Sequence, residues 1–225
     1  KIYSNQLFNG SRQVEAALWL FWVAQQYAAF TGDPQGAWEK FKAPLKKIAD
    51  SFIEGGRMGV SLNRDNGMLW TKMNGVALSW MNAYGSNSLP IAERGGYQVE
   101  TNSLWYNALC YMVENETKYG KGGKAIYAWK ELKERIENNF YNMFWVEERA
   151  HLADYVDEKG QNKFTRPNQV FACALEYSPV SEEVRANVLH SISRELLTSR
   201  GLRTLSPKNP LYKGVYEGNQ DQRDH

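Results

Sequence analysis

The sequence predicts an all-α fold, part of an α/α toroid built from helical hairpins. Two observations predict it. Six segments with helical periodicity follow one another in three pairs, and a short linker joins the members of each pair. Long linkers, residues 57–98 and 144–166, separate the pairs. Helical hairpins joined by long excursions on one side are typical of a toroid whose loops form the rim of a funnel.

The first predicted pair covers residues 14–31 and 34–54, and a glycine follows each segment directly. Pro34 suits the first turn of a helix because its missing N–H would have no partner there. Pro44 lies inside the second segment and removes one backbone donor. We therefore expect a kink or break near Lys42 and Ala43.

The second predicted pair covers residues 99–118 and 124–141, separated by a glycine-rich turn. The third covers residues 167–176 and 181–197, with Ser181 as N-cap. Gly201 lies near the end of the last helix and fits a C-terminal stop.

Each long linker contains the signal of a small β-hairpin. Residues 59–71 include Asp65-Asn66-Gly67, a sequence suited to turns that need positive φ. Residues 154–163 include Gly160 and are interpreted in the same way. The prediction is thus a helical scaffold with small β-hairpin excursions in its long loops.

Composition narrows the class of protein. The 225 residues are 43% hydrophobic, enough for one globular domain, and 27 Lys and Arg nearly balance 25 Asp and Glu. We see no basic stripe that would favour a nucleic acid or a membrane surface, and no apolar run of membrane-spanning length. Cys110 and Cys173 each lie in an apolar helical stretch, which predicts buried, unpaired thiols and a cytoplasmic protein.

Several chemistries are disfavoured. His151, His190 and His225 are far apart and lack the spacing of metal ligands, so no metal site is predicted. The sequence has no Gly-x-Ser-x-Gly nucleophile elbow, and the glycine-rich turn at residues 120–124 lacks the features of a phosphate-binding loop.

A repeated pattern marks two helix starts. Val14-Glu15 is followed by Leu18-Trp19, and Val99-Glu100 is followed by Leu104-Trp105. In the second copy, Asn102, Trp105 and Tyr106 add amide and aromatic groups that suit a sugar ring. Each glutamate has two interpretations: a sugar-binding group, or a carboxylate that stabilises the start of its helix. For Glu15 the two stand equal, and for Glu100 we favour the pocket.

From about Ser11 to its last residue, the chain resembles the C-terminal amylo-α-1,6-glucosidase region of glycogen debranching enzymes. The resemblance rests on ordered segments: Arg94, Val99-Glu100, Asn102-Ser103-Leu104-Trp105-Tyr106-Asn107-Ala108-Leu109, Arg166-Pro167-Asn168-Gln169, residues 201–207, Tyr212 and Gly214. It implies an (α/α)6 toroid that hydrolyses the α-1,6-linked glucose of a glycogen branch point, without a cofactor and with inversion. Inversion needs an acid and a base about 6.5 to 9.5 Å apart.

The resemblance also implies roles for individual residues, and branched α-glucan as the partner. Arg94, Arg166, Asn168 and Gln169 are expected to bind sugar hydroxyls, and Trp80, Trp105 and Tyr106 to offer stacking surfaces. Glu15 matches an acidic family position that contacts sugar. We expect Trp80, Arg94, Glu100, Arg166 and Asn168 to converge on one concave face, because all lie in or just after the long linkers.

The chain departs from the family pattern at Asn82. The family usually has Trp-Met-Asp where this chain has Trp80-Met81-Asn82, and that Asp is taken to be a catalytic carboxyl. An amide has no titratable proton near neutral pH and cannot act as a general acid. Either Glu100, the nearest candidate in sequence, replaces it, or this step is impaired.

The chain also begins without Met and ends at His225, before the last family segments. We expect residues 1–225 to be one fragment of the (α/α)6 domain, truncated at both ends, with the second carboxyl downstream. Two rivals stand beside the glucosidase: a non-catalytic α-glucan-binding module, and another toroid glycosidase such as a trehalase-like enzyme. Oligomeric state is left open.

Overall fold

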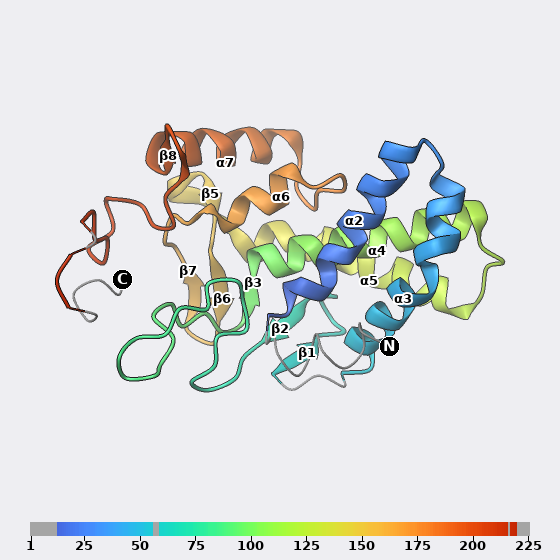
Figure 1. The fold of residues 1–225 in the computed structure, drawn as a ribbon, viewed down its shortest axis with the longest axis horizontal. Helices are drawn as coiled ribbons and strands as arrows, with labels where there is room; N and C mark the ends of the chain where they lie inside the picture. Colours follow the sequence, from blue (N-terminus) through green and yellow to red (C-terminus); the bar gives the residue numbers. More distant parts are fainter. Residues whose placement is uncertain (1–12, 56–58, 216, 220–225) are drawn as a thin grey trace.

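The computed structural model describes residues 13–55, 59–215 and 217–219. Within these residues it contains six α-helices and four small antiparallel sheets, so the protein is mainly helical (Figure 1). The helices are α2 (Glu15–Thr31), α3 (Pro34–Ile53), α4 (Val99–Tyr119), α5 (Lys124–Phe144), α6 (Val170–Ala174) and α7 (Glu182–Glu195).

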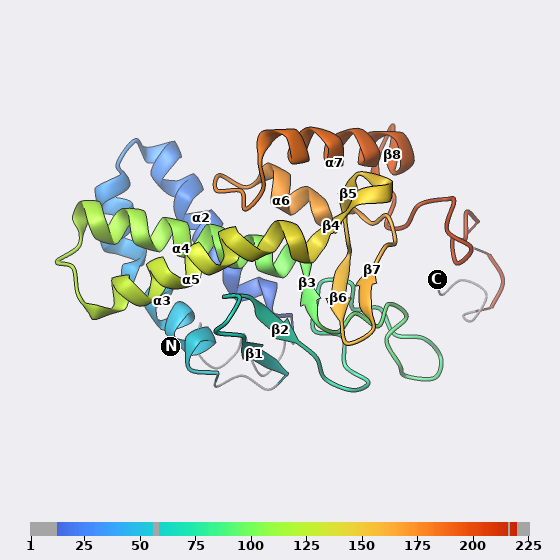
Figure 2. The same cartoon turned by 180° about the vertical axis from the view of Figure 1, so that it is seen from behind.

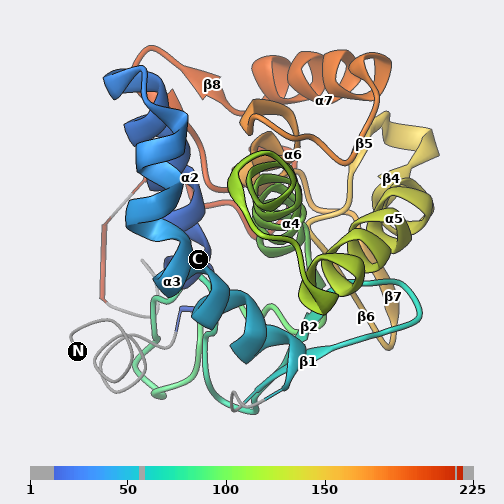
Figure 3. The same cartoon turned by 90° about the vertical axis from the view of Figure 1, so that its right-hand side faces the viewer.

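The first hairpin, α2 and α3, forms as predicted. Gly32 ends α2 in the left-handed conformation, with φ of 64°. The next residue, Asp33, caps α3 by accepting a hydrogen bond from the Gly36 backbone N–H at 2.8 Å. Pro44 does not break α3, which stays one helix. Instead, the second half of α3 turns away from the direction of the first half (Figure 3).

Helix α4 is the centre of the bundle. It packs against α2, α3, α5 and α6 and is seen end-on between them in Figure 3. Every residue from Val99 to Met112 is buried, so this part of the helix has no solvent-facing side. A helix that is buried all round must satisfy its polar side chains inside the protein. The polar residues at the start of α4 therefore need buried partners.

The third helical pair differs from its prediction in its first helix and at the C-terminal end of its second helix. Residues 167–176 form a 3₁₀ turn, η2 (Pro167–Gln169), followed by the short helix α6. Ser181 caps α7 as predicted, accepting from the Val184 backbone N–H at 3.3 Å. The helix α7 ends at Glu195 because the chain then folds into a hairpin, with Leu197 opposite Leu202 and Thr198 opposite Gly201.

Both predicted β-hairpins are present. The strands are β1 (Val60–Leu62) with β2 (Leu69–Thr71), and β6 (Tyr155–Asp157) with β7 (Gly160–Asn162). The sequence did not reveal β3 (Tyr97–Gln98), which pairs with β6, or the pairs β4 (Trp145–Val146) with β5 (His151–Leu152) and β8 (Leu197–Thr198) with β9 (Gly201–Leu202). Another 3₁₀ turn, η1 (Glu147–Arg149), lies between β4 and β5. Figure 2 shows β3, β6 and β7 side by side at the start of α4.

The cysteines are unpaired, as predicted. Cys110 is buried, and burial raises the pKa of its thiol to about 12. The prediction that Cys173 is buried too is only partly correct, because its side chain is half-buried. Of the helices described, none combines the length and the apolar character needed to cross a membrane.

Candidate functional site

Arg94 lies where the loop after β2 approaches the start of α4. Two residues later, Gly96 pairs its backbone with Thr71 on one side, and its φ is 105°. A Cβ atom at this position would lie 2.2 Å from the Val156 carbonyl oxygen of β6. Only glycine permits this close approach of two backbones. The approach holds Arg94 between the α4 start and the β6–β7 hairpin.

Arg94 is the centre of a buried ion-pair network. Its Nε donates to Asp154 Oδ2 at 2.8 Å, and its guanidinium also donates to both carboxylate oxygens of Glu100, the Nη2–Oε2 distance being 2.7 Å. A further bond reaches Ser79 Oγ at 3.2 Å. Burial alone would lower the pKa of Arg94, but the carboxylates of Asp154 and Glu100 outweigh burial and raise it.

Residues of the third hairpin extend this network. Asn168 donates to Asp154 Oδ1 at 2.7 Å and accepts a hydrogen bond from Trp80 Nε1 at 2.9 Å. Arg166 Nε lies 3.6 Å from Asp154 Oδ2. The Trp80 side chain is 40% exposed and forms the outer edge of the group. We call these six residues the Arg94 cluster: Trp80, Arg94, Glu100, Asp154, Arg166 and Asn168.

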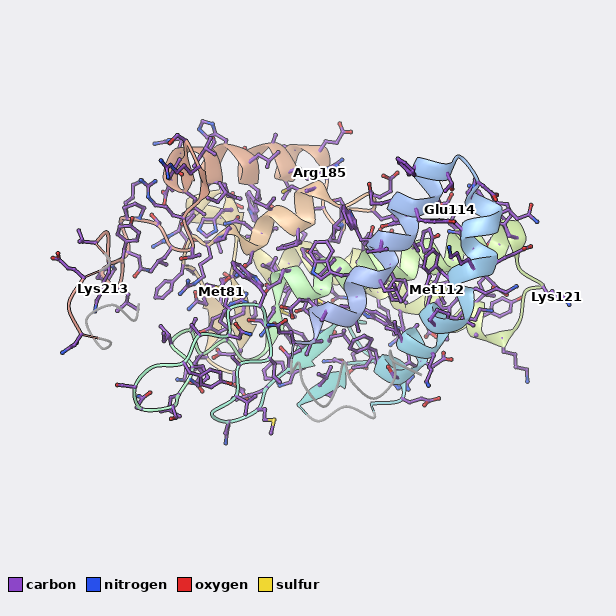
Figure 4. The ribbon with its side chains drawn as sticks, in the orientation of Figure 1. Met81, Met112, Glu114, Lys121, Arg185 and Lys213 are labelled. Atoms are coloured by element: carbon purple, nitrogen blue, oxygen red, sulfur yellow. The ribbon has the colours of Figure 1, made fainter. Side chains whose placement is uncertain are left out.

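The Arg94 cluster thus joins all five residues that were expected to converge. It lies at the end of the molecule that carries the small sheets. Met81, whose sulfur is 3.4 Å from Asn168 Nδ2, is at this end, whereas Met112 lies at the helical end (Figure 4). Sequence reasoning missed Asp154 as a site residue, although it stands in the second long linker beside a predicted β-hairpin.

Glu15 lies beside this cluster but outside its hydrogen bonds. It is 3% exposed, and among the described residues no hydrogen-bond partner is found for either carboxyl oxygen. Burial, and next the negative charge of Glu100, raise the pKa of Glu15 from its ordinary 4.5 to about 7. The backbone amides of Glu15 and Trp80 and the charge of Arg94 act in the opposite direction, with smaller effect. Glu15 is thus a buried carboxyl that forms no ion pair within residues 13–55, 59–215 and 217–219.

The two residues predicted to be catalytic lie in opposite environments. Glu100 is 0% exposed, and both of its oxygens accept hydrogen bonds from Arg94. This pairing suits a residue that positions Arg94 better than one that delivers a proton to a substrate. Asn82 is exposed, two residues after Trp80 in the loop between β2 and β3.

Four predicted sugar-binding residues lie in the protein interior instead. Trp105 is 0% exposed and donates to the Gly67 carbonyl, while the Tyr106 hydroxyl donates to Glu137 at 2.5 Å. The side-chain amide of Asn102 forms hydrogen bonds with the backbone N–H and carbonyl of Leu69. The side-chain oxygen of Gln169, Oε1, accepts from the Leu152 backbone N–H at 3.0 Å. These side chains stabilise the junction of α4 with the strands, and the two aromatic rings offer no stacking face to a sugar.

A separate groove lies between the end of α5 and the start of α7, with a volume of about 540 Å³. It is lined by Tyr141, Trp145, Glu147 and Glu183, among others, and by none of the predicted site residues. Trp145 Nε1 donates to Glu147 Oε2 at 2.5 Å, so these two polar groups of the lining are paired with each other. In the described part of the chain, no group of three or more His, Cys, Asp or Glu residues is arranged to hold a metal ion.

Comparisons with known proteins concern the fold and the family of the chain. The rhamnosidase of family GH78 from Bacillus sp. GL1 is similar in structure, with a TM-score of 0.56 over 80% of this chain and 16% identity. The chain spans 17% of the rhamnosidase's length. No curated protein sequence matches the chain. The family model for amylo-alpha-1,6-glucosidase matches residues 5–225. This match covers nearly the whole sequence, and the chain therefore belongs to the amylo-α-1,6-glucosidase family.

Proposed function

We propose that the chain is part of an (α/α)6 glycoside hydrolase domain that removes α-1,6-linked glucose from branched α-glucan in the cytoplasm. The observation that carries the proposal is the Arg94 cluster, in which the two long linkers of a glucosidase-family chain meet the start of α4 and the turn η2. The three described hairpins are half of the six in such a toroid. Both cysteines are unpaired, which supports a reducing compartment.

The cluster has the groups that a neutral sugar needs. Trp80 offers an aromatic ring that is 40% exposed, and sugar rings stack on such faces. Asn168 holds the indole N–H of Trp80 at 2.9 Å, which orients the ring. Arg166 Nη1 donates to the Thr204 carbonyl at 2.9 Å, and Arg166 Nε lies 3.6 Å from Asp154 Oδ2. The other guanidinium N–H groups are left as donors for sugar hydroxyls. We therefore propose that a sugar ring stacks on Trp80, beside Arg166 and Asn168.

Inverting hydrolysis needs one carboxyl as acid and another as base. Glu100 and Asp154 are both paired with Arg94, so we assign them to positioning. Asn82 carries an amide and has no proton to deliver. We propose that the second carboxyl of the reaction lies outside residues 1–225, because both carboxylates of the cluster, Glu100 and Asp154, are bound to Arg94.

One observation favours a second candidate function. Asn82 is exposed in the loop that carries Trp80, so its amide can bind sugar hydroxyls without assisting bond cleavage. A non-catalytic α-glucan-binding module would keep Trp80, Arg166 and Asn168 and release no glucose.

The experiment measures glucose release from a branched limit dextrin by the whole natural protein, with the anomer followed by NMR. The glucosidase releases glucose with inverted configuration, and Trp80→Ala weakens dextrin binding. Trp22→Ala is the matched control, since Trp22 is 37% exposed on α2, outside the cluster. Dextrin binding without glucose release would support the binding module instead. Hydrolysis of trehalose alone would point to the trehalase-like alternative.

A further inference from the structure

Asp154 is held firmly where the β6–β7 hairpin meets the start of α4. Its backbone N–H donates to the Asn162 carbonyl at 2.9 Å, and its own carbonyl accepts from the Val99 backbone N–H at 3.2 Å. The residue is 2% exposed, and Arg94 donates to both of its carboxylate oxygens, at 2.8 and 3.0 Å. The carboxylate of Asp154 is therefore a buried acceptor in a fixed position.

The side-chain amide of Asn168 can lie in two orientations that exchange its oxygen and its nitrogen, and its neighbours favour one of them. Its Nδ2 donates to Asp154 Oδ1 at 2.7 Å and lies 3.4 Å from the Met81 sulfur, and both of these atoms are acceptors. Its Oδ1 faces Trp80 Nε1, which can only donate, at 2.9 Å. Turning the amide over would set its oxygen against the carboxylate and its NH₂ group against the indole N–H. The carboxylate of Asp154 thus fixes the orientation of the Asn168 amide.

Through Asn168, the buried carboxylate of Asp154 is connected to the exposed ring of Trp80. Asn168 is 0% exposed, whereas Trp80 is 40% exposed. Arg166 has the same anchor, because its Nε lies 3.6 Å from Asp154 Oδ2 while its Nη1 donates to the Thr204 carbonyl at 2.9 Å. One carboxylate is thus linked, directly or through one amide, to all three side chains that are proposed to contact the sugar.

We propose that Asp154 is the positioning residue of the sugar-binding surface, a role that rests on the proposed function. It sets the orientation of the Asn168 amide and, through that amide, the position of the Trp80 ring. It also holds the Arg166 guanidinium beside them. Groups that are already in place lose less conformational entropy when a ligand binds. Loss of this carboxylate therefore weakens sugar binding, although Asp154 itself contacts no sugar.

The test exchanges the carboxylate and the amide in the whole natural protein. In Asp154→Asn, the remaining oxygen takes the Oδ2 position, because the Nε–H groups of Arg94 and Arg166 lie on that side. The new NH₂ group then faces Asn168, whose amide turns its oxygen toward it and its own NH₂ toward Trp80 Nε1. The hydrogen bond to the indole is lost. Adding Asn168→Asp places an acceptor between the two donors and restores both hydrogen bonds.

Two measurements follow the exchange: the affinity for a branched limit dextrin by calorimetry, and ¹⁹F NMR of protein labelled with fluorotryptophan. The Trp80 signal is assigned through Trp80→Phe. We expect Asp154→Asn to shift this signal and to weaken dextrin binding roughly five- to tenfold, the effect of one lost hydrogen bond. The double variant with Asn168→Asp regains the wild-type signal and affinity. Asp157→Asn is the matched control in the same hairpin, since Asp157 lies outside the cluster and accepts from the Lys159 backbone N–H.

Wild-type affinity and an unmoved Trp80 signal in Asp154→Asn overturn the proposal, and so does a folded double variant that shows the same loss. If Asp154→Asn alone does not fold, the double variant decides, because it keeps one carboxylate and one amide in the cluster. Wild-type signal and affinity in that variant then support the positioning role, and a shifted signal with weak binding overturns it. A wild-type protein that binds no dextrin refutes the proposed function instead, and the Trp80 signal still tests whether Asp154 positions the ring.

Discussion

Two helices start with the same local sequence and end up with opposite electrostatic environments. Glu15 opens α2 and Glu100 lies in the first turn of α4, each directly after a valine. Both side chains are buried, at 3% and 0% exposure. Glu100 binds Arg94 with both oxygens, whereas Glu15 finds no partner in the part of the chain that the structure describes, and its pKa is raised to about 7.

The difference arises from what each helix start faces. The α4 start faces the loop that delivers Arg94, because Gly96 lets that loop approach β6. The α2 start faces the backbone around Leu78 and Trp80, which offers no positive side chain. The Arg94 guanidinium thus makes the difference between Glu100, which is ion-paired, and Glu15, which keeps its proton. The predictions that follow test this difference between Glu15 and Glu100.

Replacing Arg94, the arginine that pairs with both Glu100 and Asp154, has the largest expected effect on the free energy of unfolding. Arg94→Met leaves the Glu100 and Asp154 carboxylates buried without their partner. We expect the free energy of unfolding, measured by urea denaturation, to fall by about 3 to 5 kcal/mol. Arg200→Met removes an exposed arginine and should change it by about 0.5 kcal/mol or less. Similar results for the two variants would contradict a central role for Arg94.

Removing the unpaired carboxyl changes how stability depends on pH. A raised pKa in the folded state means that the stability from protonated Glu15 is present below its ordinary pKa of 4.5 and is lost as the pH rises through about 7. Between pH 5 and 8, wild-type protein should therefore lose about 2 to 3 kcal/mol relative to Glu15→Gln. Denaturation at several pH values measures this, and parallel curves would show that Glu15 is not buried with its proton.

Replacing Glu100 tests whether its charge acts on Glu15. Glu100→Gln should lower the free energy of unfolding by about 2 kcal/mol, since it removes two charge-assisted hydrogen bonds. It should also lower the pKa of Glu15, because the charge of Glu100 helps to raise it. NMR titration of the ¹³C-labelled glutamate carboxyl detects the change. An unchanged Glu15 pKa would mean that the two carboxyls do not interact.

Changing the outer edge of the cluster has the smallest expected effect. Trp80→Phe removes the indole N–H that Asn168 accepts at 2.9 Å, at a cost of about 1 kcal/mol in unfolding free energy. The pKa of Glu15 should stay the same, because the Trp80 backbone affects it and the ring nitrogen does not. A shifted pKa in the same NMR titration would show that the ring shields Glu15.

Much of the fold follows from local signals in the sequence. Gly32, Ser181 and the turn at Asn66-Gly67 mark element boundaries that the structure confirms, because caps and turns depend on a few neighbouring residues. The two-residue strands could not be predicted in this way. Tyr97 and Gln98, for example, form a strand only because β6 lies beside them.

The candidate site, too, was predicted only in part from the sequence. The sequence selected five of the six residues of the Arg94 cluster, because they lie in or just after the long linkers, and it missed Asp154. It also predicted exposed faces for Trp105 and Tyr106, which α4 buries at the centre of the bundle. Aromatic residues suit a core and a sugar site equally well, so their composition cannot separate the two.

The sequence by itself determined the helical hairpins, the β-hairpin excursions and the presence of two glutamates at helix starts, because periodicity, capping and turn chemistry act over a few residues. Only the tertiary structure decided which glutamate is ion-paired and which keeps its proton. Charge state depends on burial and on groups brought from distant segments: Arg94 pairs with Glu100, and no described residue pairs with Glu15.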